Sequence, residues 1–303
     1  MPHDVIQRSH RKSSIAIDGY KDVLFRSVQS AGKDRDASEK SPDLPSKSFR
    51  RKFCVSEEQV DGYRVFTIAP KAGALKSDNH VLYLHGGGYV MDMSWGHWNF
   101  IGRLIEATGA RVTAPIYPLA PEQTCEKLVP QMQSLFAQLA ETHSAETMTI
   151  MGDSAGGGLS LAICHALRDS GEAQPSRLIL LSPWLDVTAS HPDQLEIEKH
   201  NPMISISGLK AFGELYAGDL DAKDPRVSPL FGAHDRLPPT QIFTGTADVL
   251  WPDSQRFKVA LNQAGGQCEY HEYSKMFHVW MLIPIPEGKK AMQQIADFMM
   301  TPI

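Results

Sequence analysis

The sequence lacks the features that would place it among membrane proteins or nucleic-acid-binding proteins. It has no run of about 18 apolar residues, so we expect no membrane-spanning helix. Its 35 acidic residues outnumber its 30 basic ones and give a formal net charge of −5. This balance argues against the broad positive field that attracts nucleic acid. Residues 1–11 are polar and contain no apolar signal-peptide core, so we expect a cytoplasmic protein.

Cysteine is scarce and shows no spacing typical of metal ligands. The four cysteines are far apart in the chain, and the 12 histidines form no His-Glu-x-x-His motif. In a reducing compartment such cysteines behave as small apolar residues. We therefore predict no metal site and no cofactor. The cysteines are Cys54, Cys125, Cys164 and Cys268.

From Phe53 onward, short apolar runs alternate with longer amphipathic stretches. The runs cover residues 81–85, 111–117, 148–151, 177–181, 241–244 and 268–273. The amphipathic stretches cover residues 128–142, 158–168, 254–264 and 289–300. Strands that alternate with helices of this length predict parallel βαβ units, and therefore a mostly parallel sheet with helices on both faces. A further run at 65–68 predicts an antiparallel strand near one edge.

Two regions depart from this alternation. Residues 1–52 are mostly polar and form a predicted N-terminal segment, separate from a larger domain over 53–303. Residues 187–220 contain charged residues and prolines, which indicates an insertion between two strands, with a short helix at 207–216. The N-terminal segment carries an apolar stripe that predicts one or two short helices. The stripe consists of Ile15, Ile17, Tyr20, Val23, Leu24 and Val28.

The segment Gly152-Asp153-Ser154-Ala155-Gly156 fits the pattern G-x-S-x-G. It follows an apolar run directly and precedes a stretch rich in small residues, as a nucleophile on a sharp strand-to-helix turn requires. Such a turn strains the backbone and leaves no space for large neighbours. A phosphate-binding glycine turn is the alternative, but no Walker-type lysine and no G-x-G-x-x-G pattern are present. We predict Ser154 as the nucleophile.

A second glycine motif, His85-Gly86-Gly87-Gly88, follows the run that begins at residue 81. Three consecutive glycines let backbone N–H groups approach a ligand without interference from a Cβ atom. Acyl transfer needs such donors for the developing oxyanion. We predict Gly86 and Gly87 as donors, together with the N–H of Ala155, and a structural role for His85.

The acid and the base should follow the serine along the chain, at the carboxyl ends of later strands. Asp248 lies just past the run at 241–244, and His278 lies just past the run at 268–273. Three rivals are less suitable. Asp253 begins the next helix and is predicted as its N-cap. Asp186 comes too early in the chain, and His271 lies inside a strand.

Together these motifs resemble the hormone-sensitive-lipase-like family of carboxylesterases over residues 81–303. The resemblance implies an α/β-hydrolase fold with a helical cap built from the N-terminal segment and the 187–220 insertion. It departs from the family pattern at Val249, where the family usually has proline. The matching segments are His85-Gly86-Gly87-Gly88-Tyr89, Tyr117-Pro118-Leu119-Ala120-Pro121-Glu122, Gly152-Asp153-Ser154-Ala155-Gly156-Gly157, Asp248-Val249-Leu250 with Asp253, and His278.

The resemblance further implies hydrolysis of small carboxylic esters with short acyl chains, through a Ser-Asp-His triad and an acyl-enzyme. Tyr89, Trp184 and Leu185 are candidates for the acyl pocket, and core packing is the equal alternative. An amidase or deacetylase would use the same triad. A catalytically silent small-molecule receptor is a third hypothesis, against which the presence of His278 argues.

Overall fold

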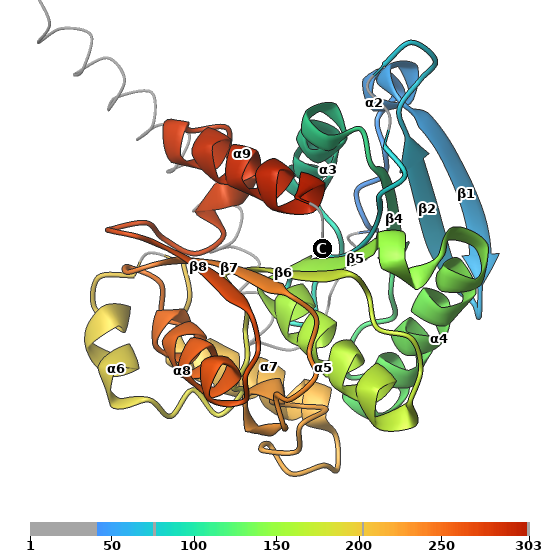
Figure 1. The fold of residues 1–303 in the computed structure, drawn as a ribbon. Helices are drawn as coiled ribbons and strands as arrows, with labels where there is room; N and C mark the ends of the chain where they lie inside the picture. The colour runs from blue at the N-terminus through green and yellow to red at the C-terminus, as the bar shows by residue number, and fades with distance from the viewer. Residues whose placement is uncertain (1–40, 75–76, 202, 302–303) are drawn as a thin grey trace, which may run out of the picture.

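The structure is a computed structural model that describes residues 41–74, 77–201 and 203–301. In this part of the chain, eight strands form one sheet through the centre of the molecule, in the order β1-β2-β4-β3-β5-β6-β7-β8 (Figure 1). β1 and β2 pair antiparallel, as do β2 and β4, and the remaining pairs are parallel. The strands are β1 (Cys54–Val60), β2 (Tyr63–Ala69), β3 (His80–Leu84), β4 (Arg111–Ile116), β5 (Met148–Asp153), β6 (Arg177–Leu181), β7 (Thr240–Gly245) and β8 (Cys268–Tyr273).

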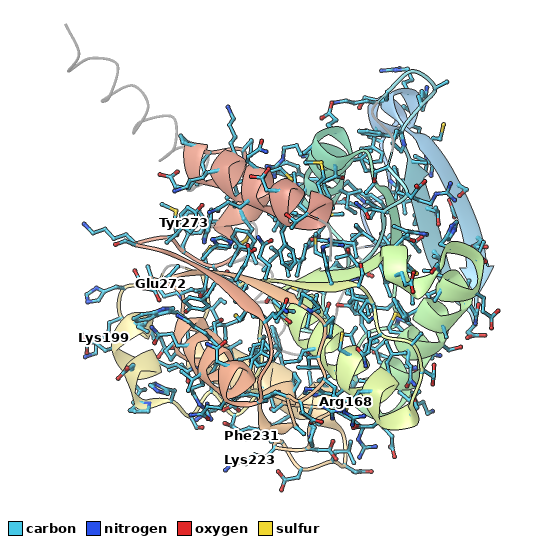
Figure 2. The ribbon with its side chains drawn as sticks, viewed as in Figure 1. Arg168, Lys199, Lys223, Phe231, Glu272 and Tyr273 are labelled. Carbon is cyan, nitrogen blue, oxygen red and sulfur yellow. The ribbon has the colours of Figure 1, made fainter. Side chains whose placement is uncertain are left out.

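The central strands are buried on both faces, whereas the edge strands are not. Every residue of β3, β5, β6 and β7 is buried, which explains why apolar residues predominate in these strands. At the β8 edge, side chains alternate between two environments. Tyr273 bonds to Gln294 on one face, and Glu272 accepts from Trp251 on the other, as Figure 2 shows for the two strand residues. β1, at the other edge, is mostly exposed and was not predicted from the sequence.

Helices cover both faces of the sheet, as the alternation predicted. Two lie on one face, α3 (Trp95–Thr108) and α9 (Pro286–Met300). On the opposite face lie α4 (Cys125–His143), α5 (Ala155–Ser170) and α8 (Trp251–Gln263) (Figure 1). Each layer buries its own apolar cluster against the sheet. Three short 3₁₀ helices, η1 (Ala145–Thr147), η2 (Pro229–Phe231) and η3 (Trp280–Leu282), complete the connections in the described residues.

The expected insertion between β6 and β7 contains two helices, α6 (Pro192–Glu198) and α7 (Ile206–Ala217). The apolar side of α7 packs into the cluster that also covers α4 and α5. Close packing requires glycine at position 213, because a Cβ there would lie 2.6 Å from the Cβ of Val187. The shared apolar cluster therefore holds the insertion against the helical layer formed by α4 and α5.

The described end of the N-terminal segment lies beside α3. Helix α2 (Lys47–Lys52) is capped by Ser46, whose hydroxyl accepts from the Phe49 amide. The centroids of the Phe49 and Trp98 rings are 5.9 Å apart. The apolar stripe predicted at residues 15–28 lies outside the described residues. Within the described ranges, no helix has the length and apolar character needed to cross a membrane.

Candidate active site

Ser154 lies on a sharp turn between β5 and α5. Its backbone is left-handed, with φ 52° and ψ −121°, a strained conformation for a residue with a side chain. The turn is held by the neighbouring chain, since the Ser154 amide donates to Leu181 at 2.9 Å and its carbonyl accepts from Trp184 at 2.8 Å. The side chain is half-buried. The strand–turn–helix context predicted for Ser154 is therefore present.

Small residues around the serine are a steric requirement. A Cβ on Gly152 would lie 2.2 Å from the carbonyl oxygen of Gly156. A Cβ on Gly156 would lie 2.0 Å from the carbonyl oxygen of Leu84, the last residue of β3. The second contact shows that the loop after β3 lies against the first turn of α5, so the two glycine motifs meet.

Asp248 and His278 are joined by a short hydrogen bond. Their Oδ2 and Nδ1 atoms are 2.8 Å apart, and both side chains are buried. The other oxygen of Asp248 accepts from the Leu250 amide at 3.0 Å, which fixes the carboxylate plane. Because a carboxylate only accepts, Nδ1 of His278 carries the hydrogen, and in the neutral ring Nε2 is then the acceptor. This is the tautomer that a general base requires.

The loop that carries His278 is held at two points. The Val279 amide donates to the Ser182 hydroxyl at 3.2 Å, and both residues have left-handed backbones, with φ 48° and 45°. Further along, the Arg103 guanidinium donates to the carbonyl of Leu282 at 2.5 Å. The first contact comes from the residue that directly follows β6, and the second comes from α3.

The loop after β3 distinguishes the predicted donors. The Gly86 amide donates to Oδ1 of Asp153 at 3.1 Å, so it already has an acceptor, whereas the predicted role in an oxyanion hole needs a free N–H group. Gly87 and Gly88 both have positive φ, 124° and 62°. Their amides have no acceptor among the residues that the structure describes. Ala155 is the first residue of α5, where an N–H lacks a partner within the helix.

His85 is a structural residue, as predicted. Its ring stacks on Tyr117 with centroids 4.1 Å apart, and its Nδ1 lies 2.7 Å from the carbonyl oxygen of Gly86. Burial lowers the pKa of His85 to about 3. The side chain is therefore neutral at neutral pH and stiffens the loop without charge.

Asp253 is not the N-cap that the sequence predicted. The cap position of α8 is Leu250, and Asp253 lies within the first turn. Its buried carboxylate pairs with Arg256 at 2.8 Å and accepts from Gln194 of the insertion at 2.9 Å. Burial, followed by the nearby charge of Asp186, raises the pKa of Asp253 to about 6.

The other two rivals are also bonded elsewhere. Asp186 pairs with Arg256 at 3.2 Å and accepts from Thr188 at 2.6 Å. His271 stacks on Phe243 with centroids 4.7 Å apart. Among the described residues, Asp248 is the carboxylate that bonds to His278.

The three pocket candidates belong to the core. Tyr89, Trp184 and Leu185 are each at most 1% exposed. The Tyr89 ring stacks between Tyr216 at 3.5 Å and Trp184 at 5.5 Å. This packing favours the alternative that the three side chains are part of the core next to the site.

Comparisons with known proteins match this part of the chain. A family model described as alpha/beta hydrolase fold matches residues 81–282. The chain is 33% identical over 226 residues to an esterase from Acinetobacter venetianus, which covers 72% of this chain and 73% of that protein. It is 31% identical over 224 residues to an acetyl-hydrolase from Streptomyces hygroscopicus, covering 73% and 75%. A solved esterase from the bacterial hormone-sensitive lipase family has 29% identity and a TM-score of 0.76, over 86% of this chain and 92% of that one.

Proposed function

The chain belongs to the α/β-hydrolase family, among the hormone-sensitive-lipase-like carboxylic ester hydrolases, and from this premise we propose that it hydrolyses short-chain acyl esters through Ser154, His278 and Asp248. The observation that carries the proposal is the bond of 2.8 Å between His278 and Asp248. It joins a residue from the loop after β7 to a residue from the loop after β8. Ser154 follows β5, so all three residues lie at the carboxyl ends of parallel strands. The strained elbow at Ser154 supports its role as the nucleophile.

The proposed reaction has two halves. Nε2 of His278 accepts the hydroxyl proton of Ser154 while Oγ attacks the ester carbonyl carbon. The tetrahedral intermediate then collapses, and the alcohol leaves with the proton from His278. Water attacks the acyl-enzyme by the same route, which releases the carboxylic acid and restores Ser154. Asp248 keeps the imidazole in the required tautomer and stabilises its positive form.

The amides of Gly87, Gly88 and Ala155 are the proposed oxyanion donors. The two glycine amides have no acceptor in the described part of the chain, and the loop packs against the turn that contains Ala155. Backbone donors fixed before the reaction stabilise developing charge without reorganising. Gly88 replaces Gly86 in this assignment because the Gly86 amide already donates to Asp153.

The insertion that carries α6 and α7 is the proposed cap. Phe212 of α7 lies beside the oxyanion loop, since a Cβ on Gly88 would be 2.7 Å from its ring. A wall this close to the reacting carbonyl restricts the space for the substrate, which supports small acyl groups. The name of the acetyl-hydrolase relative supports the same size class.

The decisive experiment combines substitution with labelling. Ser154→Ala should lower kcat for p-nitrophenyl acetate by a factor on the order of 10⁶ while leaving the circular dichroism spectrum unchanged. A fluorophosphonate should label the wild-type protein at Ser154, identified by peptide mass spectrometry, and should not label the variant. Labelling at another residue, or turnover retained in the variant, would contradict the assignment.

Substrate class is tested with matched ligands. Esters of increasing acyl length should show kcat/KM falling beyond the short chains, and amides of the same acyl groups should be poor substrates. Equal turnover of the amides would instead identify an amidase that uses the same residues.

A further inference from the structure

The carboxylate of Asp153, the residue before the proposed nucleophile, is a buried hub of hydrogen bonds. It is 2% exposed. Its Oδ1 accepts from the Tyr83 hydroxyl at 2.6 Å and from the Gly86 amide at 3.1 Å. Its Oδ2 lies 3.5 Å from Nε2 of His97 on α3. Three donors therefore converge on two oxygens.

The tautomer of His97 follows from its other contact. The Ser94 amide donates to Nδ1 of His97 at 2.9 Å, so Nδ1 is an acceptor and Nε2 carries the hydrogen that faces Asp153. Burial by itself raises the pKa of Asp153, but its interactions with His97 and the bond from Tyr83 more than offset this, and the net pKa is lowered. Asp153 is therefore ionised at neutral pH, with partners that all donate.

The bond to Gly86 connects this hub to the oxyanion loop. Gly86 lies so close to the nucleophile that a Cβ there would be 2.3 Å from Oδ2 of Asp153 and 3.0 Å from the Cβ of Ser154. The two residues after Gly86 carry the amides without acceptors. Because Asp153 and Ser154 are consecutive, the backbone that presents the serine also holds the loop that presents the donors.

We propose that Asp153 is a positioning residue, which fixes the loop His85–Gly88 relative to Ser154 so that the Gly87 and Gly88 amides face the reacting carbonyl. This inference rests on the proposed ester hydrolysis and adds a residue to it. Its chemical basis is that only a carboxylate accepts from all three donors. An asparagine would offer one oxygen and one N–H₂ group, and that N–H₂ would oppose either His97 or the loop amide.

The position of His97 allows a compensating change. His97 is the third residue of α3 and accepts from the Ser94 amide in a capping box. Glutamate is a usual residue at that position, because its side chain reaches back to the same amide. His97→Glu keeps this cap but turns the group that faces residue 153 from a donor into an acceptor. It should therefore be harmful beside Asp153 and favourable beside an asparagine.

The test is a double-mutant cycle with two readouts, kcat/KM for p-nitrophenyl acetate and the affinity for an alkyl boronic acid, which mimics the tetrahedral intermediate. Asp153→Asn should lower kcat by about 10²-fold with little change in KM, the size of the loss when one oxyanion donor is removed. Boronic acid affinity should fall by a similar factor. Asp153→Asn with His97→Glu should recover most of both losses. If Asp153→Asn alone does not fold, the test compares the double variant with His97→Glu alone. The double variant should then have the higher kcat/KM and the higher boronic acid affinity.

Tyr83→Phe is the matched control, because it removes one donor to the same oxygen and leaves the Gly86 bond. It should change thermal stability more than boronic acid affinity. Unchanged kcat in Asp153→Asn, failure of the double variant to recover, or an equal affinity loss in Tyr83→Phe would overturn the positioning role. Fluorophosphonate labelling of wild-type Ser154 separates the two proposals. If Ser154 is not labelled, the proposed function fails. If Ser154 is labelled, the double-mutant cycle tests only the role of Asp153.

Discussion

At the scale of single residues, neighbouring side chains decide what identical groups do. Asp248 and Asp253 are five positions apart, and each is 0% exposed. Asp248 accepts from His278, and Asp253 accepts from Gln194 and pairs with Arg256. One carboxylate therefore orients an imidazole, while the other joins the insertion to α8. Position in the sequence led to the prediction for Asp248 but gave a wrong role for Asp253, whose partner Gln194 is 59 residues away in the chain.

Substituting these two carboxylates should give opposite results. Asp248→Asn should lower kcat by about 10⁴-fold, because the amide no longer holds His278 in the required tautomer. Asp253→Asn should leave kcat within about 3-fold, since Asp253 has no bond to the triad, and should change stability instead. Steady-state kinetics on p-nitrophenyl acetate, beside urea unfolding of both variants, measures the contrast. A large kcat loss confined to Asp253→Asn would reverse the assignment of the acid.

At the scale of elements, the site is made by the ends of parallel strands and the strained turns that follow them. The residues with left-handed backbones there include Ser154, Ser182 and Val279, with φ of 52°, 45° and 48°. For a β-branched residue such as Val279 this conformation is costly, by about 1–2 kcal/mol. Neighbouring elements must therefore maintain it, and the Ser182 hydroxyl is one group that does so.

Ser182→Ala should destabilise the fold by about 1–3 kcal/mol, because it leaves the buried Val279 amide without an acceptor. Ser182→Ala should also lower kcat with little effect on KM, because His278 directly precedes Val279, whose amide loses its acceptor. Ser160→Ala is a suitable control. Ser160 is equally buried, but its hydroxyl donates to the Gly156 carbonyl within α5. Comparable losses of kcat in both variants would show that the effect is general to buried serines near the elbow.

At the scale of the whole molecule, a buried charged network joins the insertion to the catalytic domain. Gln194 of α6 donates to Asp253 of α8, and Arg256 pairs with both Asp253 and Asp186. One guanidinium thus serves two carboxylates, each 0% exposed as a side chain. This excess of buried negative charge is consistent with the raised pKa of Asp253.

The raised pKa predicts a loss of stability with rising pH. The pKa of Asp253 is about 6 in the fold and 3.8 in its ordinary state, so the folded state binds the proton more tightly. The protonated Asp253 therefore contributes to the free energy of unfolding. This contribution is complete below about pH 3.8 and is lost as the pH rises through about 6, and it amounts to a difference on the order of 3 kcal/mol. Urea unfolding of wild type and Asp253→Asn should show the variant gaining in relative stability across this window. Asp297→Asn, at an exposed position, is the control and should show no such gain. If the stabilities of wild type and Asp253→Asn change in parallel with pH, the prediction is contradicted.

Much of the molecule followed from local patterns in the sequence. Five buried strands, β3 to β7, were predicted because a strand covered on both faces is rich in apolar residues. The serine turn was predicted because its glycines lie two residues from Ser154 on either side. Strand β1 was missed because an edge strand needs no such run, and its sequence is mostly polar. The bond from the Gly86 amide to Asp153 was not predicted, because the two residues are 67 positions apart in the chain. Pairings of this kind leave no periodic signal.

The same long separations affect how the site is built when the chain folds. The bond between His278 and Asp248 spans 30 residues, and the bond between Val279 and Ser182 spans 97. Contacts this distant close large loops, whose entropy opposes them until the intervening strands and helices have formed. Secondary structure can therefore be largely complete while the groups that perform the chemistry are still apart. Recovered catalysis, unlike recovered helix content, reports that the last of these loops has closed.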